Sequence, residues 1–121
     1  RGLEVRLRVP DRPVRVRGDE GALERVVENL VHNAGKYARS TFDVEVGESV
    51  GGRVTVTFAN DVDAAFSCEV DRLFAPGERS GLGLAIARSL VGQMGGTLDA
   101  CLEQRGGERW LCLRLELAAI G

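Results

Sequence analysis

Apolar and polar residues alternate near the start of the chain and then follow a helical spacing. Residues 3–17 alternate on either side of a Pro-Asp-Arg-Pro interruption at 10–13, which predicts a β-hairpin with one buried face. From Asp19 to about Arg39, apolar positions recur every three or four residues, which predicts an amphipathic helix capped by Asp19. The apolar positions of this helix are Leu23, Val26, Val27, Leu30, Val31, Ala34 and Ala38.

The middle of the chain combines strand patterns with two further helices. We expect strands at about 42–47 and 53–59, a short helix near 69–74 and a longer helix over about 80–94. Ser67 has a side chain suited to capping the short helix. Gly95 and Gly96 form the glycine stop that commonly ends a helix.

The C-terminal segment alternates on both sides of Gly106-Gly107, which predicts a second hairpin with its turn at these glycines. In this register one face carries only Leu98, Ala100, Leu102, Leu111, Leu113 and Leu115. The opposite face pairs Asp99 with Arg114, Cys101 with Cys112 and Glu103 with Trp110. We therefore expect an apolar inner face and an outer face with a stabilising pair of opposite charges.

This order of elements predicts an α/β (α+β) fold of two layers. We expect a mixed, mostly antiparallel sheet, covered on one face by about three helices because its apolar face must be buried. Its size suits a single domain over residues 1–121. The chain starts at Arg1 without a methionine or a signal-peptide pattern, so we expect it to be a piece of a longer protein.

Composition argues against several classes of function. The 44% share of hydrophobic residues is too high for intrinsic disorder, and no apolar run approaches the roughly 20 residues of a membrane span. A formal net charge of −2 gives no general attraction to nucleic acid or to an anionic membrane, so we expect neither as a partner. Cys68, Cys101 and Cys112 lack CxxC spacing, which indicates reduced thiols of a cytoplasmic protein rather than zinc ligands.

The long helix carries polar residues that a purely structural helix would avoid. Asn29, Asn33 and Lys36 stand at positions i, i+4 and i+7 and form a polar stripe beside the apolar one. Lys36 is the single lysine among the 16 basic residues. Amide oxygens are hard, uncharged ligands that suit Mg²⁺, so this stripe can hold a hydrated cation and the phosphates that it neutralises.

A glycine-punctuated segment supplies a second candidate site. Gly81-Leu82-Gly83-Leu84 opens the helix that follows. Glycines at a helix start let backbone N–H groups approach an anion, and the helix dipole adds a partial positive charge there. The amide stripe and this segment together favour a site for a phosphate that carries magnesium.

In this order and at this spacing, the two motifs resemble those of the ATP-binding domain of sensor histidine kinases, in the GHKL (Bergerat-fold) superfamily. The run DEGALERVVENLVHNAGKYA is similar to the asparagine box of that family, and SGLGLAIARSLVGQMGGTL is similar to its second glycine box. The stretch EVDRLF resembles the short helix that precedes the nucleotide lid. The resemblance covers nearly the whole chain and implies ATP and Mg²⁺ as ligands.

The resemblance also implies roles for individual residues. Asn33 would bind the Mg²⁺ that bridges the ATP phosphates, and Asn29 would support the phosphates or a metal-bound water. Lys36 would contact a phosphate oxygen, and Tyr37 would line the adenine side. The resemblance further implies that the segment Gly81, Leu82, Gly83 and Leu84 surrounds a phosphate. It also implies that Arg79, in the lid, adds a charged contact to the nucleotide.

The first glycine box departs from the family pattern. Usually Asp-x-Gly-x-Gly, it aligns with Asn60-Asp61-Val62-Asp63-Ala64, so that Asn60 replaces the aspartate that receives the adenine amino group. An amide oxygen can still accept that hydrogen bond. Val62 and Ala64 replace both glycines. Asp61 or Asp63 could accept the hydrogen bond from the adenine amino group instead, and the sequence does not decide among Asn60, Asp61 and Asp63.

The nucleotide lid also departs from the pattern. Only residues 75–80 separate Phe74 from Gly81, far fewer than is typical of the family. A short lid would cover ATP poorly and leave the site open. Both departures sustain a rival hypothesis, a degenerate pseudokinase-like regulatory module with weak or no ATP binding.

Asn29 bears on the type of reaction. By resemblance, hydrolytic members carry a glutamate at this position to activate water, whereas kinases carry asparagine, which is no general base. Glu28 lies about 100° away around the helix and does not substitute for it. We therefore expect phosphoryl transfer that rests on positioning and charge neutralisation. We expect neither a nucleophile nor the phosphoacceptor in this chain, and we expect His32 either to face solvent or to support the residues that bind the metal.

The resemblance implies the catalytic, ATP-binding domain of a two-component sensor histidine kinase. The γ-phosphate would pass to a histidine on a separate dimerisation domain and then to a response regulator. We expect a cytoplasmic domain without direct membrane contact, in a parent protein anchored in the bacterial inner membrane. The other rival is an anti-sigma-factor-type protein serine kinase, which the sequence upstream of the domain would distinguish.

Overall fold

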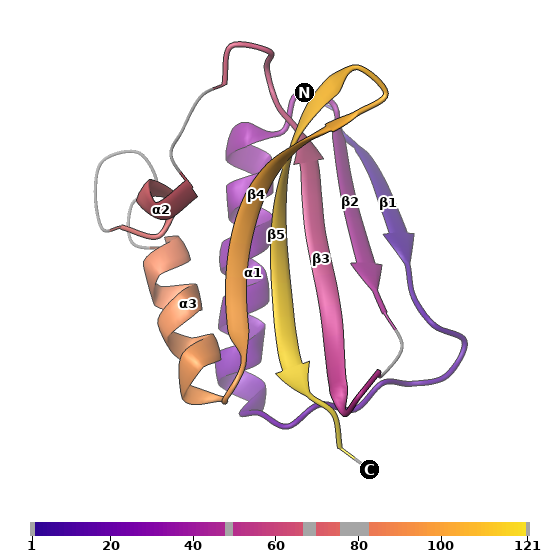
Figure 1. The fold of residues 1–121 in the computed structure, drawn as a ribbon, viewed down its shortest axis with the longest axis vertical. Helices are drawn as coiled ribbons and strands as arrows, with labels where there is room; N and C mark the ends of the chain where they lie inside the picture. The colour runs from indigo at the N-terminus through magenta and orange to yellow at the C-terminus, as the bar shows by residue number, and fades with distance from the viewer. Residues whose placement is uncertain (1, 48–49, 67–69, 76–82, 121) are drawn as a thin grey trace.

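The computed structural model describes residues 2–47, 50–66, 70–75 and 83–120. These residues form a five-stranded sheet with helices on one face (Figure 1). In chain order the elements are β1 (Glu4–Arg8), α1 (Glu20–Tyr37), β2 (Thr41–Val46), β3 (Arg53–Asp61), α2 (Val70–Leu73), α3 (Gly83–Gln93), β4 (Thr97–Arg105) and β5 (Glu108–Ala118). The predicted two-layer α/β sandwich is confirmed.

The sheet is mixed, with strand order β1-β2-β3-β5-β4. Strands β1 and β2 are parallel, and the other neighbours are antiparallel. The predicted hairpin over residues 3–17 is wrong, because β1 pairs with β2 across the α1 crossover and places Glu4 beside Thr41. The second half of that segment makes one isolated bridge, from Val16 to Ala119. Alternation identifies the two faces of a strand but not its partner, and a parallel partner always lies beyond a crossover.

Helix α1 begins and ends within two residues of its predicted bounds. The Asp19 carboxylate caps it by accepting a hydrogen bond from the Ala22 N–H at 2.8 Å. Its buried residues are Val26, Leu30, Asn33 and Ala34. Val31, on the predicted apolar face, is 46% exposed, and Leu7 of β1 is 67% exposed. The helix layer does not extend over β1 (Figure 1), so the apolar side of that strand stays uncovered.

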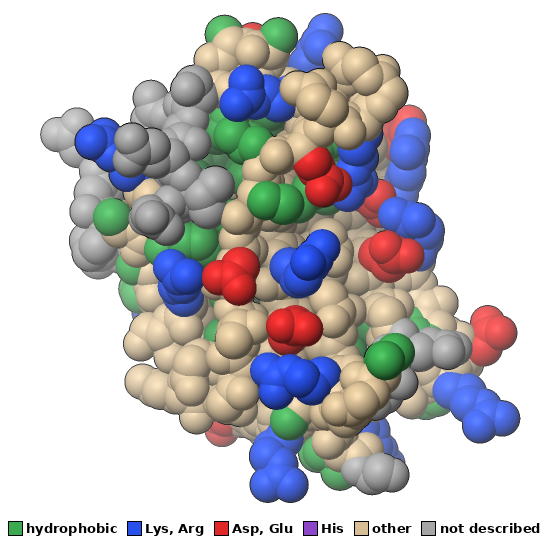
Figure 2. All heavy atoms as spheres, viewed as in Figure 1, with side chains coloured by type: hydrophobic (Ala, Val, Ile, Leu, Met, Phe, Trp, Pro, Cys, Tyr) green, Lys and Arg blue, Asp and Glu red, His purple; other side chains and the backbone are tan. Residues whose placement is uncertain are grey.

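The predicted register of the C-terminal hairpin is confirmed. Cys101 lies opposite Cys112, and Asp99 lies opposite Arg114. Gly106 and Gly107 turn the chain with φ of 55° and 83°, a region that other residues rarely adopt. The leucines at 98, 111, 113 and 115 are buried on the helix side, as the alternation requires. Charged side chains of both signs are distributed over the outer face (Figure 2).

The shorter helices agree with the predicted elements where the structure describes them. Helix α2 lies within the predicted range 69–74, and its predicted cap, Ser67, lies outside the described residues. Helix α3 ends just before Gly95, which has a φ of 78°. A Cβ atom on Gly96 would lie 2.2 Å from the Glu116 carbonyl oxygen. Only glycine at this position therefore lets the chain pack this closely against β5. None of the described helices is long and apolar enough to cross a membrane.

Candidate functional site

Two buried amides on α1 form the centre of the candidate site. The side-chain nitrogens of Asn29 and Asn33 are buried and have no hydrogen-bond partner among the described residues, and Asn33 is only 5% exposed. A buried donor without a partner costs about 1–3 kcal/mol, so structure alone gives no reason to keep two of them. An amide can present either its nitrogen or its oxygen by rotating. These groups therefore suit a ligand with phosphate oxygens or a hard cation.

The start of α3 lies against Asn29, one of these two amides. A Cβ atom on Gly83 would lie 3.8 Å from Cγ and Oδ1 of Asn29, so the two predicted parts of the site are adjacent. Gly83 is the first residue of α3, where backbone N–H groups lack helical partners and can bind an anion. The Leu84 side chain is buried in the core, which leaves only its backbone for such a contact. Three predicted site residues, Arg79, Gly81 and Leu82, lie outside the described residues.

The C-terminal end of α1 carries the predicted phosphate and adenine residues. Lys36 is exposed, and its Nζ lies 5.2 Å from the centroid of the Tyr37 ring. Tyr37 is half-buried and meets Phe66 edge-on, with ring centroids 5.4 Å apart. An ammonium group and an aromatic pair thus lie within one helical turn of Asn33.

The three candidates for the adenine amino group differ in their surroundings. Asn60 is 2% exposed and lies opposite Leu111, so its side chain is on the helix side of the sheet. Its Nδ2 donates to the Asp61 carbonyl oxygen at 2.9 Å, which leaves Oδ1 as an acceptor. Asp63 is exposed and accepts a hydrogen bond from the Ala65 N–H at 2.9 Å. Among these residues the geometry favours Asn60.

Asp61 joins the end of β3 to the segment that follows α1. Its Oδ1 accepts hydrogen bonds from the N–H groups of Arg39, Ser40 and Thr41 at 3.1, 2.8 and 2.9 Å, and its Oδ2 accepts one from the Ser40 hydroxyl. Burial raises the pKa of this carboxyl, but the hydrogen bonds together lower it more, so the net pKa is below the ordinary value. Asp61 therefore acts as a structural anchor whose oxygens already have partners.

The residues that replace the glycines of the first box fit the fold without backbone strain. Val62 is buried in the core, and its N–H donates to the Arg109 carbonyl oxygen at 2.9 Å. Ala64 is exposed. Within the described ranges only glycines have a positive φ, so neither Val62 nor Ala64 adopts a conformation that requires glycine.

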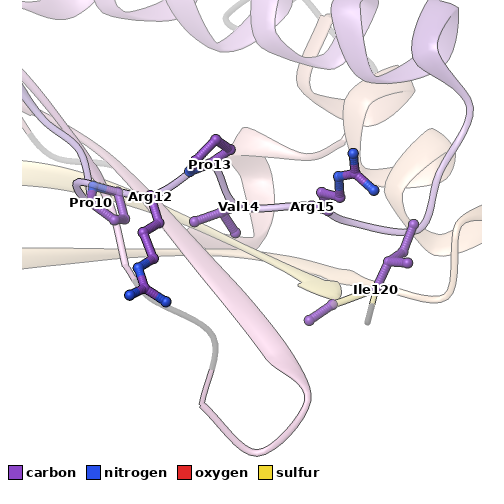
Figure 3. Close-up of a pocket in the computed structure, with 7 residues that line it drawn as sticks. Pro10, Arg12, Pro13, Val14, Arg15 and Ile120 are labelled. Carbon is purple, nitrogen blue, oxygen red and sulfur yellow. The ribbon is translucent and has the colours of Figure 1, made fainter.

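A hollow of about 530 Å³ lies away from this site (Figure 3). Its lining consists of Pro10, Arg12, Pro13, Val14, Arg15, Ala119 and Ile120. These residues lie near the N-terminal end of α1, whereas Lys36 lies in its last turn (Figure 1). The hollow is therefore no part of the candidate site.

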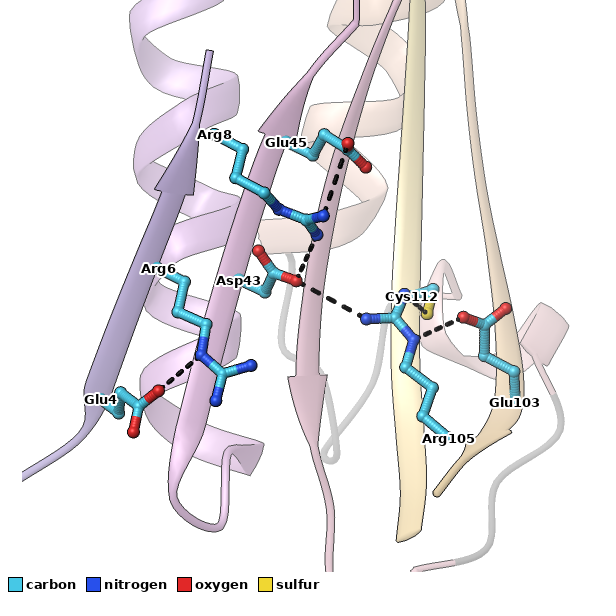
Figure 4. A network of polar contacts seen from close by, with 8 residues as sticks. All are labelled: Glu4, Arg6, Arg8, Asp43, Glu45, Glu103, Arg105 and Cys112. Carbon is cyan, nitrogen blue, oxygen red and sulfur yellow. Dashed lines mark hydrogen bonds and ion pairs between the residues drawn. The ribbon is translucent and has the colours of Figure 1, made fainter. Parts of the chain in front are cut away.

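Two polar features of the molecule are not evident from the sequence. The anchoring role of Asp61 becomes visible once β3 is known to reach residue 61, because alternation then places Asp61 and Asn60 on opposite faces. The second feature is Asp43, buried on the outer face with its Oδ2 2.8 Å from Arg8 and 3.7 Å from Arg105 (Figure 4). Alternation along β2 marks Asp43 as outward-facing but gives no sign of its distant partner on β4.

Comparison with known proteins agrees with this geometry. Residues 18–119 match the family model described as histidine kinase-, DNA gyrase B- and HSP90-like ATPase. The chain belongs to this family. The predicted superfamily and fold are thereby confirmed.

Relatives of this chain among curated proteins are bacterial sensor proteins. The chain is 29% identical over 127 residues to the sensor protein RstB of Escherichia coli, an alignment that covers 88% of the chain and 29% of RstB. It is 34% identical over 110 residues to the sensor protein KdpD of Mycobacterium tuberculosis, covering 84% of the chain and 12% of KdpD. The chain thus spans less than a third of the length of either relative. These names do not favour the pseudokinase or serine-kinase alternatives.

Solved structures of histidine kinases share the fold. The mycobacterial sensor histidine kinase MprB superposes with a TM-score of 0.81 at 25% identity, over 97% of this chain and 82% of that chain. The full-length structure of ShkA in complex with AMPPNP superposes with a TM-score of 0.78 at 25% identity, over 99% of this chain and 27% of that chain. The nucleotide-free catalytic domain of histidine kinase ThkA, at 22% identity and a TM-score of 0.77, is similar in fold.

Proposed function

We propose that this chain is the catalytic domain of a longer sensor histidine kinase, which binds Mg-ATP and donates the γ-phosphate to a histidine elsewhere. The observation that carries the proposal is a pair of buried amide nitrogens, on Asn29 and Asn33, that have no partner within the described part of the chain. Asn29 also lies beside Gly83, the first residue of α3. Family membership and the AMPPNP bound in the ShkA structure support it.

Each part of the site has a distinct task in this proposal. Asn33, with Asn29 beside it, holds the cation through its amide oxygen, and the Asn60 oxygen accepts the adenine amino group. When Mg²⁺ is bound, it would neutralise the negative charge of the phosphates. Lys36 contacts a phosphate oxygen, and Tyr37 lines the adenine side. The Gly81-to-Leu84 segment contributes backbone N–H groups to the phosphates, with Arg79 beside it.

The chemistry of this chain favours transfer over hydrolysis. Asn29 cannot remove a proton from water, because an amide is no general base near neutral pH. Glu28 is exposed and one residue away, which turns it to a different side of α1. The domain thus positions the nucleotide and neutralises its charge, while the acceptor histidine supplies the nucleophile.

The partners in this proposal belong to the rest of the signalling system. RstB and KdpD are each more than three times as long as the matched segment, so a dimerisation domain with the acceptor histidine has room outside it. The phosphoryl group then moves to an aspartate of a response regulator. His32 is exposed on α1 and is not the acceptor in this scheme. Because ATP is a cytoplasmic metabolite, we place the domain on the cytoplasmic side.

The proposal predicts that AMPPNP with Mg²⁺ raises the melting temperature of the chain. Ligand at about 100 times its dissociation constant stabilises a fold by about 2.7 kcal/mol, a shift on the order of 10 °C for a domain of this size. In Asn33→Ala the Mg²⁺-dependent part of the shift should disappear. The unliganded melting temperature should stay within about 2 °C, because the substitution removes a buried donor that has no partner in the described ranges.

Gln104→Ala is the matched control, since it removes an exposed amide from the outer end of β4 and should keep the full shift. No shift of the wild-type chain at millimolar AMPPNP would instead favour a degenerate module. A second test labels the full-length parent protein with radioactive phosphate and then treats it with acid. Acid removes phosphate from histidine but leaves phosphoserine intact. Acid-stable label would favour the serine-kinase alternative.

A further inference from the structure

The outer face of the β4–β5 hairpin gathers two thiols and a carboxylate. Cys101 and Glu103 are two residues apart on β4 and share a face, and Cys112 lies directly opposite Cys101. The two sulfur atoms and a Glu103 carboxylate oxygen lie within 4.8 Å of one another. In a tetrahedral zinc site the ligand atoms are about 3.6–3.8 Å apart. Side-chain rotations that move the ligand atoms by about an ångström would bring these three atoms into that arrangement.

We propose that Cys101, Glu103 and Cys112 bind a thiophilic divalent cation, of which Zn²⁺ is the representative. Two sulfurs and one carboxylate oxygen fill three vertices of a tetrahedron. The fourth vertex is open to water, because Cys101 is exposed at the surface. The argument against zinc from CxxC spacing does not apply here, because these ligands converge from two facing strands.

Arg105 balances the charge of this cluster. Its Nε donates to Glu103 at 2.9 Å, and its Nη2 donates to the Cys112 sulfur at 3.5 Å (Figure 4). Its guanidinium also lies 4.8 Å from the Trp110 ring centroid. On binding, the cation displaces the two thiol protons into water. The resulting two thiolates and the carboxylate carry three negative charges, which the divalent cation and the guanidinium together offset. Hydrogen bonds of this kind hold the ligand atoms in a fixed orientation.

The proposed cation site is chemically and spatially separate from the nucleotide site. It lies on the outer face of the sheet, whereas Asn29 and Asn33 lie on α1, behind the sheet (Figure 1). Thiolate ligands select ions such as Zn²⁺ and Cd²⁺, while amide and water oxygens suit Mg²⁺. Mg²⁺ should therefore not compete for the cysteine cluster.

Titration of the reduced chain with Cd²⁺ under nitrogen tests the proposal. The ultraviolet charge-transfer absorption of cadmium bound to thiolates should saturate at one equivalent and should persist in millimolar Mg²⁺. Cys101→Ser should weaken Cd²⁺ binding by at least about tenfold, because it removes a soft ligand from an exposed position. Glu103→Gln should also weaken it, since an amide is a poorer ligand than a carboxylate for this ion.

Two control variants separate the cluster from general effects. Cys68→Ser leaves all three proposed ligands in place, and Glu116→Gln removes a carboxylate elsewhere on β5, so both should bind Cd²⁺ as the wild type does. Zn²⁺ should raise the melting temperature of the wild type but not that of Cys101→Ser. A missing absorption band, equal binding by Cys101→Ser, or displacement by Mg²⁺ would each overturn the proposal.

Discussion

At the scale of single residues, Asp61 illustrates how one carboxylate can determine local geometry. It gathers three backbone N–H groups and one hydroxyl from the segment just after α1. These donors would otherwise need water or other partners at the junction of helix and sheet. The neighbouring Asn60 is thereby left to face the helix side, where we propose that it binds adenine.

Asp61→Asn should therefore destabilise the fold by about 1–3 kcal/mol at neutral pH, because an amide is a weaker acceptor and one of its atoms is a donor. The native pKa of Asp61 lies below the ordinary 3.8, so its contribution is complete above that value and is lost as pH falls through the native pKa. Urea denaturation at pH 7, 5 and 3 should show the difference between wild type and variant shrinking only at the lowest pH. Asp63→Asn, at an exposed position, should change stability little at any of them.

At the scale of elements, the sequence of α1 determines where the helix begins and ends and which side of it is buried. Asp19 supplies the cap, and the three- and four-residue spacing supplies the buried side. The same helix carries Asn33 on a buried part of its surface, so the element that completes the core also presents the site. Its stability and its function are therefore connected.

Asp19→Ala should lower the free energy of unfolding by about 1 kcal/mol, the usual cost of losing an N-cap. The corresponding fall in melting temperature is about 4 °C for a domain of this size. Differential scanning calorimetry measures it, with Asp11→Ala in the exposed loop after β1 as the control. An equal loss in both variants would contradict the capping role.

Local patterns predicted the elements better than they predicted the partners. The β4–β5 register follows from the sequence because alternation and two turn glycines agree on it. The partner of β1 does not follow, because it lies beyond an entire helix. At the site, helical spacing places Asn29, Asn33 and Lys36 together, whereas the choice among the adenine candidates depends on where β3 ends.

At the scale of the whole molecule, the core occupies only part of the sheet. It lies between the helices α1 and α3 and the strands β2, β3, β5 and β4. The edge strand β1 lies outside the cover of the helices, and its apolar residues Val5 and Leu7 are exposed, as is Val9 just after it. Apolar residues of the same kind therefore contribute very differently to stability.

A matched pair of leucines measures this difference. Leu113→Ala should cost about 2–5 kcal/mol, because it leaves a cavity in the buried core. Leu7→Ala should change the free energy of unfolding by less than about 0.5 kcal/mol, because the side chain is already largely in water. Chemical denaturation of both variants gives the two values. Similar losses would show that β1 is covered in solution.

Strand β5, the last element of the chain, lies inside the sheet between β3 and β4. Its long pairing with β3 joins Arg53 to Ala118, so the middle of the sheet closes only through contacts that are remote in sequence. Such topologies fold slowly. On the ribosome, the hydrogen-bonding edge of β3 has no neighbour on that side until the final strand has emerged. A nascent chain of this domain therefore carries an open β edge until β5 has emerged, and such an edge is prone to pair with other chains during that interval.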